Sequence, residues 1–249
     1  MHYTPGIADH LLAWSFGCFL PILTVINYRR FRSDKAMTLS TQEKIRFYRM
    51  NSLFLSGMGG STLLVWTLNG HTAADLGLMI QAAHFTANFW GLLALFLILF
   101  MFDVAMSFTN DKARKRTAIA QERNIPFIPS GKKQFLWYLL MCIAAGIGEE
   151  IFFRGFLIQY IQCMVPTEKY RMVLAITIPA VCFTMGHAYQ GAKALFKILL
   201  LSLLFGLLYV SSQSLLPVIL LHAGIDALNG WLSMTLLKNE RNGKIRKLE

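Results

Sequence analysis

Three short segments of this chain place ionisable or aromatic side chains four residues apart within long apolar runs. They are Glu149-Glu150-Ile-Phe-Phe-Arg154, Phe183-Thr-Met-Gly-His187 and His222-Ala-Gly-Ile-Asp226. A charged residue in the middle of a membrane costs about 2.5–3.5 kcal/mol on insertion scales, so such residues need partners or water and are usually functional. Carboxylates and imidazoles are also common general acids and bases in enzymes. The three segments therefore predict a site for proton-transfer chemistry inside the membrane.

Helix geometry separates the two adjacent glutamates. At about 100° per residue, Glu150 and Arg154 lie about 40° apart on one helix face, whereas Glu149 is rotated by about 100° from Glu150. We therefore expect Glu150 to pair with Arg154. Glu149 is then the freer carboxylate, able to face a cavity and act as a general base. The alternative is that both glutamates only join helices through Arg154.

The two histidines are further candidates. His187 lies one helical turn after Phe183, and a lone histidine in a membrane helix equally well donates a hydrogen bond for helix packing. His222 and Asp226 project from the same helix face, so Asp226 could orient His222 or bind a ligand beside it. The alternative for this pair is a purely structural hydrogen bond between helices.

The composition is that of a membrane protein. The chain has 249 residues, of which 55% are hydrophobic and 15% are charged, and its mean hydropathy is +0.48. Runs of about 20 apolar residues, enough to cross a hydrocarbon layer of about 30 Å, lie at 7–28, 50–68, 76–106, 134–162, 170–190, 193–211 and 214–237. We therefore expect an all-α, polytopic bundle of about seven transmembrane helices in one membrane domain, 1–249.

The net charge of +11 comes from basic residues in the connections between apolar runs. They lie mainly at 29–49, 112–133 and 238–247, which fall on one side of the membrane if there are seven spans. The positive-inside rule then places the C-terminus in the cytoplasm and the N-terminus outside, with the plasma membrane as the expected location. We expect these residues to contact lipid headgroups rather than nucleic acid. Residues 110–124 could form a basic helix on the inner leaflet or a solvated connector.

Taken together and in this order, the three segments resemble the signature of the CAAX protease and bacteriocin-processing (CPBP, or Abi) family of intramembrane proteases. This family is also called the type II CAAX prenyl endopeptidases. The resemblance covers about residues 134–237, which we expect to be the catalytic core. Residues 1–133 would then supply additional spans with basic cytoplasmic loops.

The resemblance implies an intramembrane endopeptidase. Its substrate would be a membrane-associated or lipid-modified, CAAX-type protein or peptide, or a peptide in bacteriocin processing. Glu149 and His187 would activate water, while His222 and Asp226 would face the transition state. Eukaryotic members usually carry asparagine where this chain has Asp226. Because an ionised carboxylate cannot donate to an oxyanion, Asp226 would be protonated, orient His222 or bind a metal.

Two further questions stay open at the level of sequence. Glutamate, aspartate and histidine suit a divalent metal such as zinc, but no His-Glu-x-x-His helix is present, and the family has been described both as metalloproteases and as metal-independent glutamate proteases. The chain could also be a non-catalytic scaffold, regulator or bacteriocin-immunity protein that retains the site. A proton-coupled transporter is less favoured, because no repeated half is visible.

Overall fold

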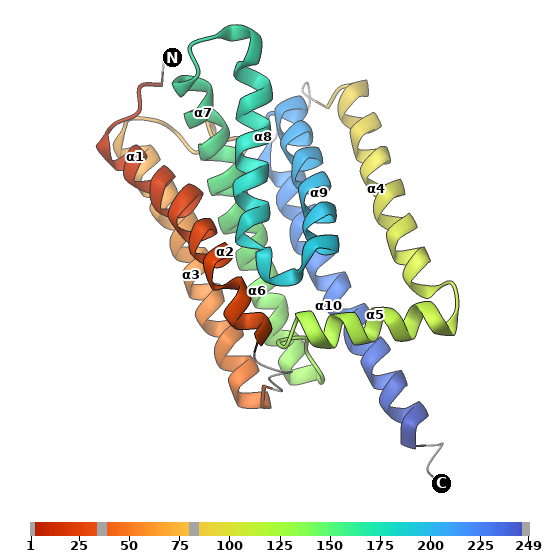
Figure 1. The fold of residues 1–249 in the computed structure, drawn as a ribbon. Coiled ribbons are helices and arrows are strands. Elements are labelled where there is room, and N and C mark those ends of the chain that lie inside the picture. Colours follow the sequence, from red (N-terminus) through yellow and green to blue (C-terminus); the bar gives the residue numbers. More distant parts are fainter. Residues whose placement is uncertain (1–2, 34–38, 80–84, 246–249) are drawn as a thin grey trace.

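The computed structural model describes residues 3–33, 39–79 and 85–245, although the side chains of residues 28–33, 122–124 and 238–245 lie outside its description. Within this part of the chain the protein is all-α, as predicted, and forms eight helices. They are α1–α2 (Ile7–Leu12 and Leu20–Ser33, joined by the π-helical Ala13–Phe19), α3 (Thr41–Leu68), α4 (Ala87–Phe108), α5 (Asp111–Asn124), α6–α7 (Lys132–Glu150 and Ile158–Met164, joined by the π-helical Ile151–Leu157), α8 (Glu168–Gly186), α9 (Ala192–Ser212) and α10 (Leu215–Ile245). Figure 1 shows most of them side by side in one bundle.

Five helices of the described chain are long and apolar enough to cross a membrane, so the protein is an integral membrane protein. They are Ile7–Asn27, Ala87–Phe108, Lys132–Met164, Ala192–Ser212 and Leu215–Leu237. The helices α3 and α8, with 28 and 19 residues, are not among the five but run alongside them in the bundle (Figure 1). Their positions agree with two of the apolar runs in the sequence.

The run expected at 76–106 is not one helix, because α4 begins only at Ala87. The apolar residues before it have a different role. Leu76 is fully buried in a turn, and the Gly77 carbonyl accepts a hydrogen bond of 2.7 Å from the Leu215 amide. Gly77 has a φ of +81°, and a Cβ there would lie 2.8 Å from the Gln213 carbonyl oxygen. Leu76 is therefore apolar because it packs inside the protein beside the α9–α10 turn, while residues 80–84 of the expected run lie outside the described residues.

Two glycines place α6 at the centre of the bundle. A Cβ on Gly146 would lie 2.9 Å from the carbonyl oxygen of Ile219 in α10, and a Cβ on Gly148 would collide with the carbonyl of Leu55 in α3. Without side chains at these positions, α6 approaches both neighbouring backbones closely, as small residues allow in membrane bundles. The end of α6 that carries Glu149 and Glu150 is thereby held between α3 and α10.

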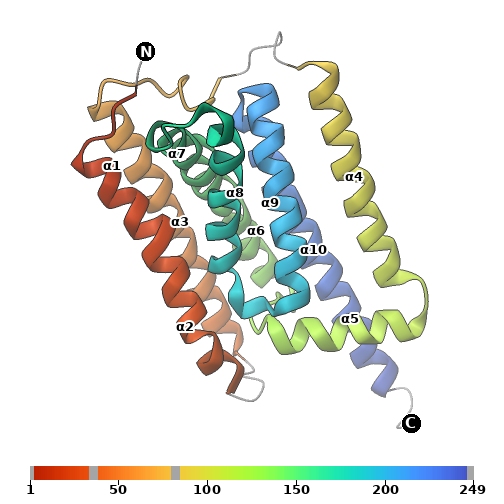
Figure 2. The same cartoon turned by 45° about the horizontal axis from the view of Figure 1, so that its top comes forward.

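One end of the bundle, here called the basic end, collects the described basic side chains of α3, α5 and the start of α6. They are Lys44, Arg46, Arg49, Lys112, Arg114, Lys115, Arg116, Lys132 and Lys133. The helix α5 crosses the bundle at this end, towards which the last turns of α10 also extend, while the described N-terminal residues lie at the opposite end (Figures 1 and 2). The remaining basic residues of the three basic connections, at 29–35, 123 and 238–247, have side chains that the structure does not describe.

Candidate active site

The predicted pair of Glu150 and Arg154 is present. Arg154 Nη1 donates to Glu150 Oε1 over 2.8 Å, and the two side chains are only 2% and 0% exposed. Arg154 Nη2 also donates to Ser202 Oγ over 2.8 Å. The guanidinium carbon lies 4.7 Å from the ring centre of Phe183 and 5.4 Å from that of Phe205, distances typical of cation–π contacts. Arg154 thus joins α6, α8 and α9.

Glu150 has a second partner that the sequence did not indicate. His222 Nδ1 lies 2.6 Å from Glu150 Oε1, the same oxygen that binds Arg154. A carboxylate paired with arginine is ionised and only accepts hydrogen bonds, so His222 Nδ1 is the donor. Glu150 therefore orients the imidazole of His222, a role that the spacing had offered to Asp226.

The other nitrogen of His222 faces the two remaining carboxylates. His222 Nε2 lies 3.5 Å from Glu149 Oε2 and 3.6 Å from Asp226 Oδ2. The side chains of Glu149 and Asp226 are 16% and 40% exposed, unlike the fully buried Glu150. Glu149 is therefore the more accessible of the two adjacent glutamates, as the helix geometry predicted.

His187 is fixed by its own helix. It follows directly after α8, and its Nδ1 lies 2.8 Å from the carbonyl oxygen of Phe183. Because a carbonyl only accepts, Nδ1 carries the hydrogen, and Nε2 of the neutral ring is a free acceptor. The ring also packs against Phe183, with 4.5 Å between centroids. In the described part of the chain, His187 forms no hydrogen bond or ion pair with Glu149, His222 or Asp226.

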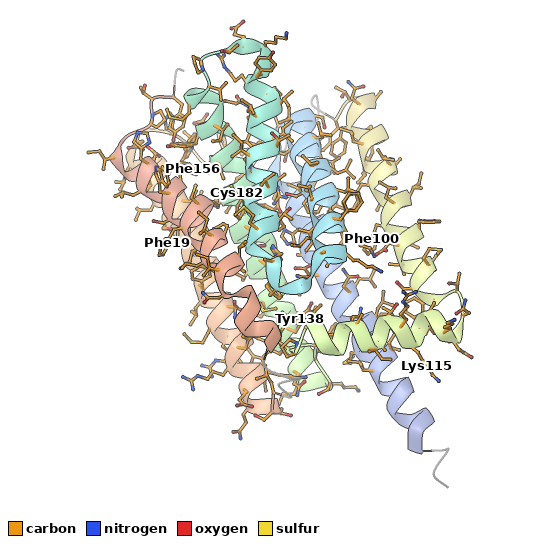
Figure 3. The ribbon with its side chains drawn as sticks, viewed as in Figure 1. Phe19, Phe100, Lys115, Tyr138, Phe156 and Cys182 are labelled. Carbon is orange, nitrogen blue, oxygen red and sulfur yellow. The ribbon has the colours of Figure 1, made fainter. Side chains whose placement is uncertain are left out.

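All four residues nevertheless line one cavity of about 480 Å³. This volume lies in the range of sites that enclose small ligands, which is about 300–1,000 Å³. Part of its wall is apolar and comes from the first two helical spans, with side chains that include Phe16, Leu20, Phe54 and Met58. Its polar part lies around the two histidines and also includes Tyr138, which Figure 3 shows towards the basic end. A polar centre beside an apolar wall suits a substrate with an apolar segment.

Glu149, His187, His222 and Asp226 are also of the types that bind metal ions. Glutamate, aspartate and neutral histidine are zinc ligands. Yet among the residues that the structure describes, no three histidine, cysteine, aspartate or glutamate side chains are grouped so that they could hold a metal ion. The described side chains therefore do not form a ready-made metal site. The Nδ1 atoms of His187 and His222 donate to Phe183 and Glu150, which leaves Nε2 of each ring free, and histidines that bind metals use the same arrangement.

Sequence patterns did not identify Ser202, Phe205 or Tyr189 as part of this region. Ser202 had a usable signal, since it is a single hydroxyl residue in the middle of the apolar stretch 198–208. Tyr189 follows His187 by two residues and lines the same cavity. Phe205 gave no signal, because one phenylalanine among many apolar residues is unremarkable in sequence.

The part of the chain that carries these residues matches a known protein family. Residues 131–228 match the family model described as Type II CAAX prenyl endopeptidase Rce1-like. This range begins just before α6 and ends after Asp226. It therefore contains the residues that interact around the two histidines, which are Glu149, Glu150, Arg154, His187, Ser202, His222 and Asp226. No curated protein and no solved structure matches the chain significantly.

Proposed function

Because residues 131–228 form a domain of the Rce1-like type II CAAX prenyl endopeptidase family, we propose that this chain is an intramembrane endopeptidase. It hydrolyses a peptide bond in a membrane-associated or lipid-modified, CAAX-type protein or peptide. The observation that carries this proposal is that Glu149, His187, His222 and Asp226, from three separate helices, line one cavity in an integral membrane protein. Water, a base and a transition-state donor could meet there.

In the proposed reaction, Glu149 is the general base. A water molecule lies between its carboxylate and Nε2 of His187, which is free to accept a hydrogen bond because Nδ1 donates to Phe183. The water oxygen attacks the carbonyl carbon of the substrate, and its proton passes to Glu149. When the C–N bond of the tetrahedral intermediate breaks, the same proton moves to the leaving nitrogen. Atoms and charges then balance, and the enzyme returns to its starting state.

His222 and Asp226 lie beside this base and face the reacting carbon. His222 receives its orientation from Glu150, which is itself held by Arg154. With Nδ1 donating to Glu150, Nε2 is the nitrogen that can hold a proton between Glu149 and Asp226. Glu150 and Arg154 are therefore positioning residues. They keep the imidazole in one orientation and do not touch the substrate.

The apolar wall of the cavity supports the proposed substrate class. Phe16 and Leu20 come from the first span, and Phe54 and Met58 come from α3, so this wall belongs to helices outside the matched family domain. A lipid chain or an apolar peptide segment would pack there while the scissile bond lies near Glu149. Membrane lipids are thus partners of the protein as well as its solvent.

We also propose a seven-span topology, with α3 and α8 crossing the membrane beside the five apolar helices. The basic end is then cytoplasmic and the N-terminus lies outside the plasma membrane, because cytoplasmic loops carry an excess of lysine and arginine. Cys163 is exposed near the end of α7, opposite the basic end. A membrane-impermeant maleimide should label it in intact cells, and Cys163→Ser should abolish this label. Labelling only after the cells are opened would contradict the orientation.

The function itself is tested by a cleavage assay in liposomes. Purified wild-type protein is incubated with a library of peptides, with and without a farnesylated C-terminal cysteine motif, and with or without a metal chelator. We expect cleavage by the wild type and a loss of at least about 10²-fold in His187→Ala, since a general acid or base typically contributes 10²–10⁴-fold. Normal activity in His187→Ala would contradict the site. A membrane scaffold would show no cleavage and would keep its cellular phenotype in both proteins.

A further inference from the structure

The proposed reaction needs a hydrogen-bond donor for the substrate carbonyl oxygen, which becomes negatively charged during attack. Glu149, His187, His222 and Asp226 are poor donors for this oxygen. Glu149 and Asp226 are carboxylates, which accept hydrogen bonds when ionised. The Nδ1 hydrogens of His187 and His222 already bind Phe183 and Glu150. His222 Nε2 donates only when the ring is fully protonated, and it then faces two carboxylates.

Tyr189 offers a neutral donor in the same cavity. Its ring is inclined by 30° to that of His187, with 6.1 Å between the centroids, and its centroid lies 6.2 Å from that of Phe127. These contacts place the phenol beside His187 in the polar part of the cavity. Tyr189, Glu149 and Asp226 line the same cavity, so the phenol lies in the cavity where charge would develop.

The hydrogen of this hydroxyl is available. Gln190 Nε2 donates to the Tyr189 oxygen over 3.2 Å, which occupies one lone pair and leaves the O–H free to donate. Among the described residues, no group accepts a hydrogen bond from the Tyr189 O–H. Tyr138, the other phenol of the polar region, differs in this respect, because its hydroxyl donates to the backbone carbonyl of Asp226 over 3.1 Å.

We propose that the Tyr189 hydroxyl donates a hydrogen bond to the scissile carbonyl oxygen as this oxygen becomes an oxyanion. This inference rests on the proposed endopeptidase function and assigns Tyr189 as a further catalytic residue. No proton leaves the phenol, so the proton balance of the reaction is unchanged. A neutral donor at this place supplies the interaction that an ionised Asp226 cannot make.

Tyr189→Phe tests the proposal, since it removes the hydroxyl and keeps the ring that packs against His187 and Phe127. We expect kcat to fall by about 10²–10³-fold, the usual effect of removing one oxyanion donor, while KM changes less than twofold. The matched control is Tyr209→Phe. Tyr209 is a buried tyrosine outside the cavity, and its hydroxyl contacts the Leu76 carbonyl over 3.4 Å. This variant should keep the wild-type kcat.

A second measurement separates catalysis from structure. A peptide phosphonate mimics the tetrahedral intermediate, and its affinity should weaken in Tyr189→Phe by the same factor as kcat/KM. Binding of the uncleaved peptide to Glu149→Ala should not change when Tyr189→Phe is added. If Tyr189→Phe lowers the melting temperature, 3-fluorotyrosine at position 189 replaces it. This more acidic phenol keeps the ring, and we expect a higher kcat below its pKa.

An unchanged kcat in Tyr189→Phe, a change in KM alone, or an unchanged kcat with 3-fluorotyrosine overturns the role of Tyr189, while cleavage that depends on Glu149 would still support the endopeptidase. If neither the wild-type protein nor Glu149→Ala cleaves any peptide, the endopeptidase function itself falls, and the role of Tyr189 falls with it.

Discussion

Glu149→Gln is expected to lower kcat by about 10²–10⁴-fold while the protein keeps its fold. Glutamine has nearly the same shape as glutamate, and its side chain can occupy the same wall of the cavity. It cannot take the proton of the attacking water, however, and the amide cannot return a proton to the leaving nitrogen. The measurement is single-turnover cleavage of a peptide identified in the liposome assay, with the melting temperature in detergent recorded for each protein.

The matched control for this substitution is Glu168→Gln. Glu168 begins α8 near the end of the bundle opposite the basic end, and its side chain is 90% exposed. Its loss should leave kcat within twofold of the wild type. Equal activity in Glu149→Gln and Glu168→Gln would show that Glu149 is not the base, and attention would turn to His187 or Asp226.

Arg154→Met is expected to destabilise the protein by about 3–5 kcal/mol, the typical effect of removing one partner from a buried ion pair. Glu150 is fully buried, and its second oxygen, Oε2, has no hydrogen-bond partner among the described residues. Without Arg154, its charge would be balanced only through His222. The free energy of unfolding in detergent micelles, from denaturant titration of the purified protein, measures the effect.

An exposed ion pair elsewhere in the same protein provides the comparison. Arg171 lies 3.9 Å from Glu168, and these side chains are 39% and 90% exposed. Pairs of this kind contribute about 0–1 kcal/mol, so Glu168→Gln, which removes this pair, should have little effect. The double variant Glu150→Gln/Arg154→Met should be more stable than Arg154→Met, because glutamine is neutral and its oxygen can still accept from His222. A loss of stability in Arg154→Met no larger than in Glu168→Gln would contradict this role of the Glu150–Arg154 pair.

Much of the fold follows from the apolar runs, because a helix that crosses a membrane must satisfy its own backbone hydrogen bonds. Most of the predicted runs are helices, and the long run at 134–162 is the continuous helix Lys132–Met164. The prediction of one helix at 76–106 was wrong for a physical reason. Hydropathy does not distinguish an apolar side chain that faces lipid from one that packs inside the protein, and Leu76 is of the second kind.

Contacts within one helix follow directly from the spacing of residues along the chain. Glu150 meets Arg154, and His187 meets the carbonyl of Phe183, because residues four apart share a helix face whatever surrounds them. These local rules also identified Glu149 as the more accessible of the two glutamates. They require only the helical repeat, which the structure confirms around Glu150 and Phe183.

Contacts between helices depend instead on how the helices pack in three dimensions. Glu150 and His222 are 72 residues apart, and Arg154 and Ser202 are 48 apart, so no local spacing relates them. Their contacts depend on how far each helix is rotated and shifted against its neighbours. The close approach at Gly146 and Gly148 sets the position of α6, because it brings α6 directly against the backbones of α10 and α3.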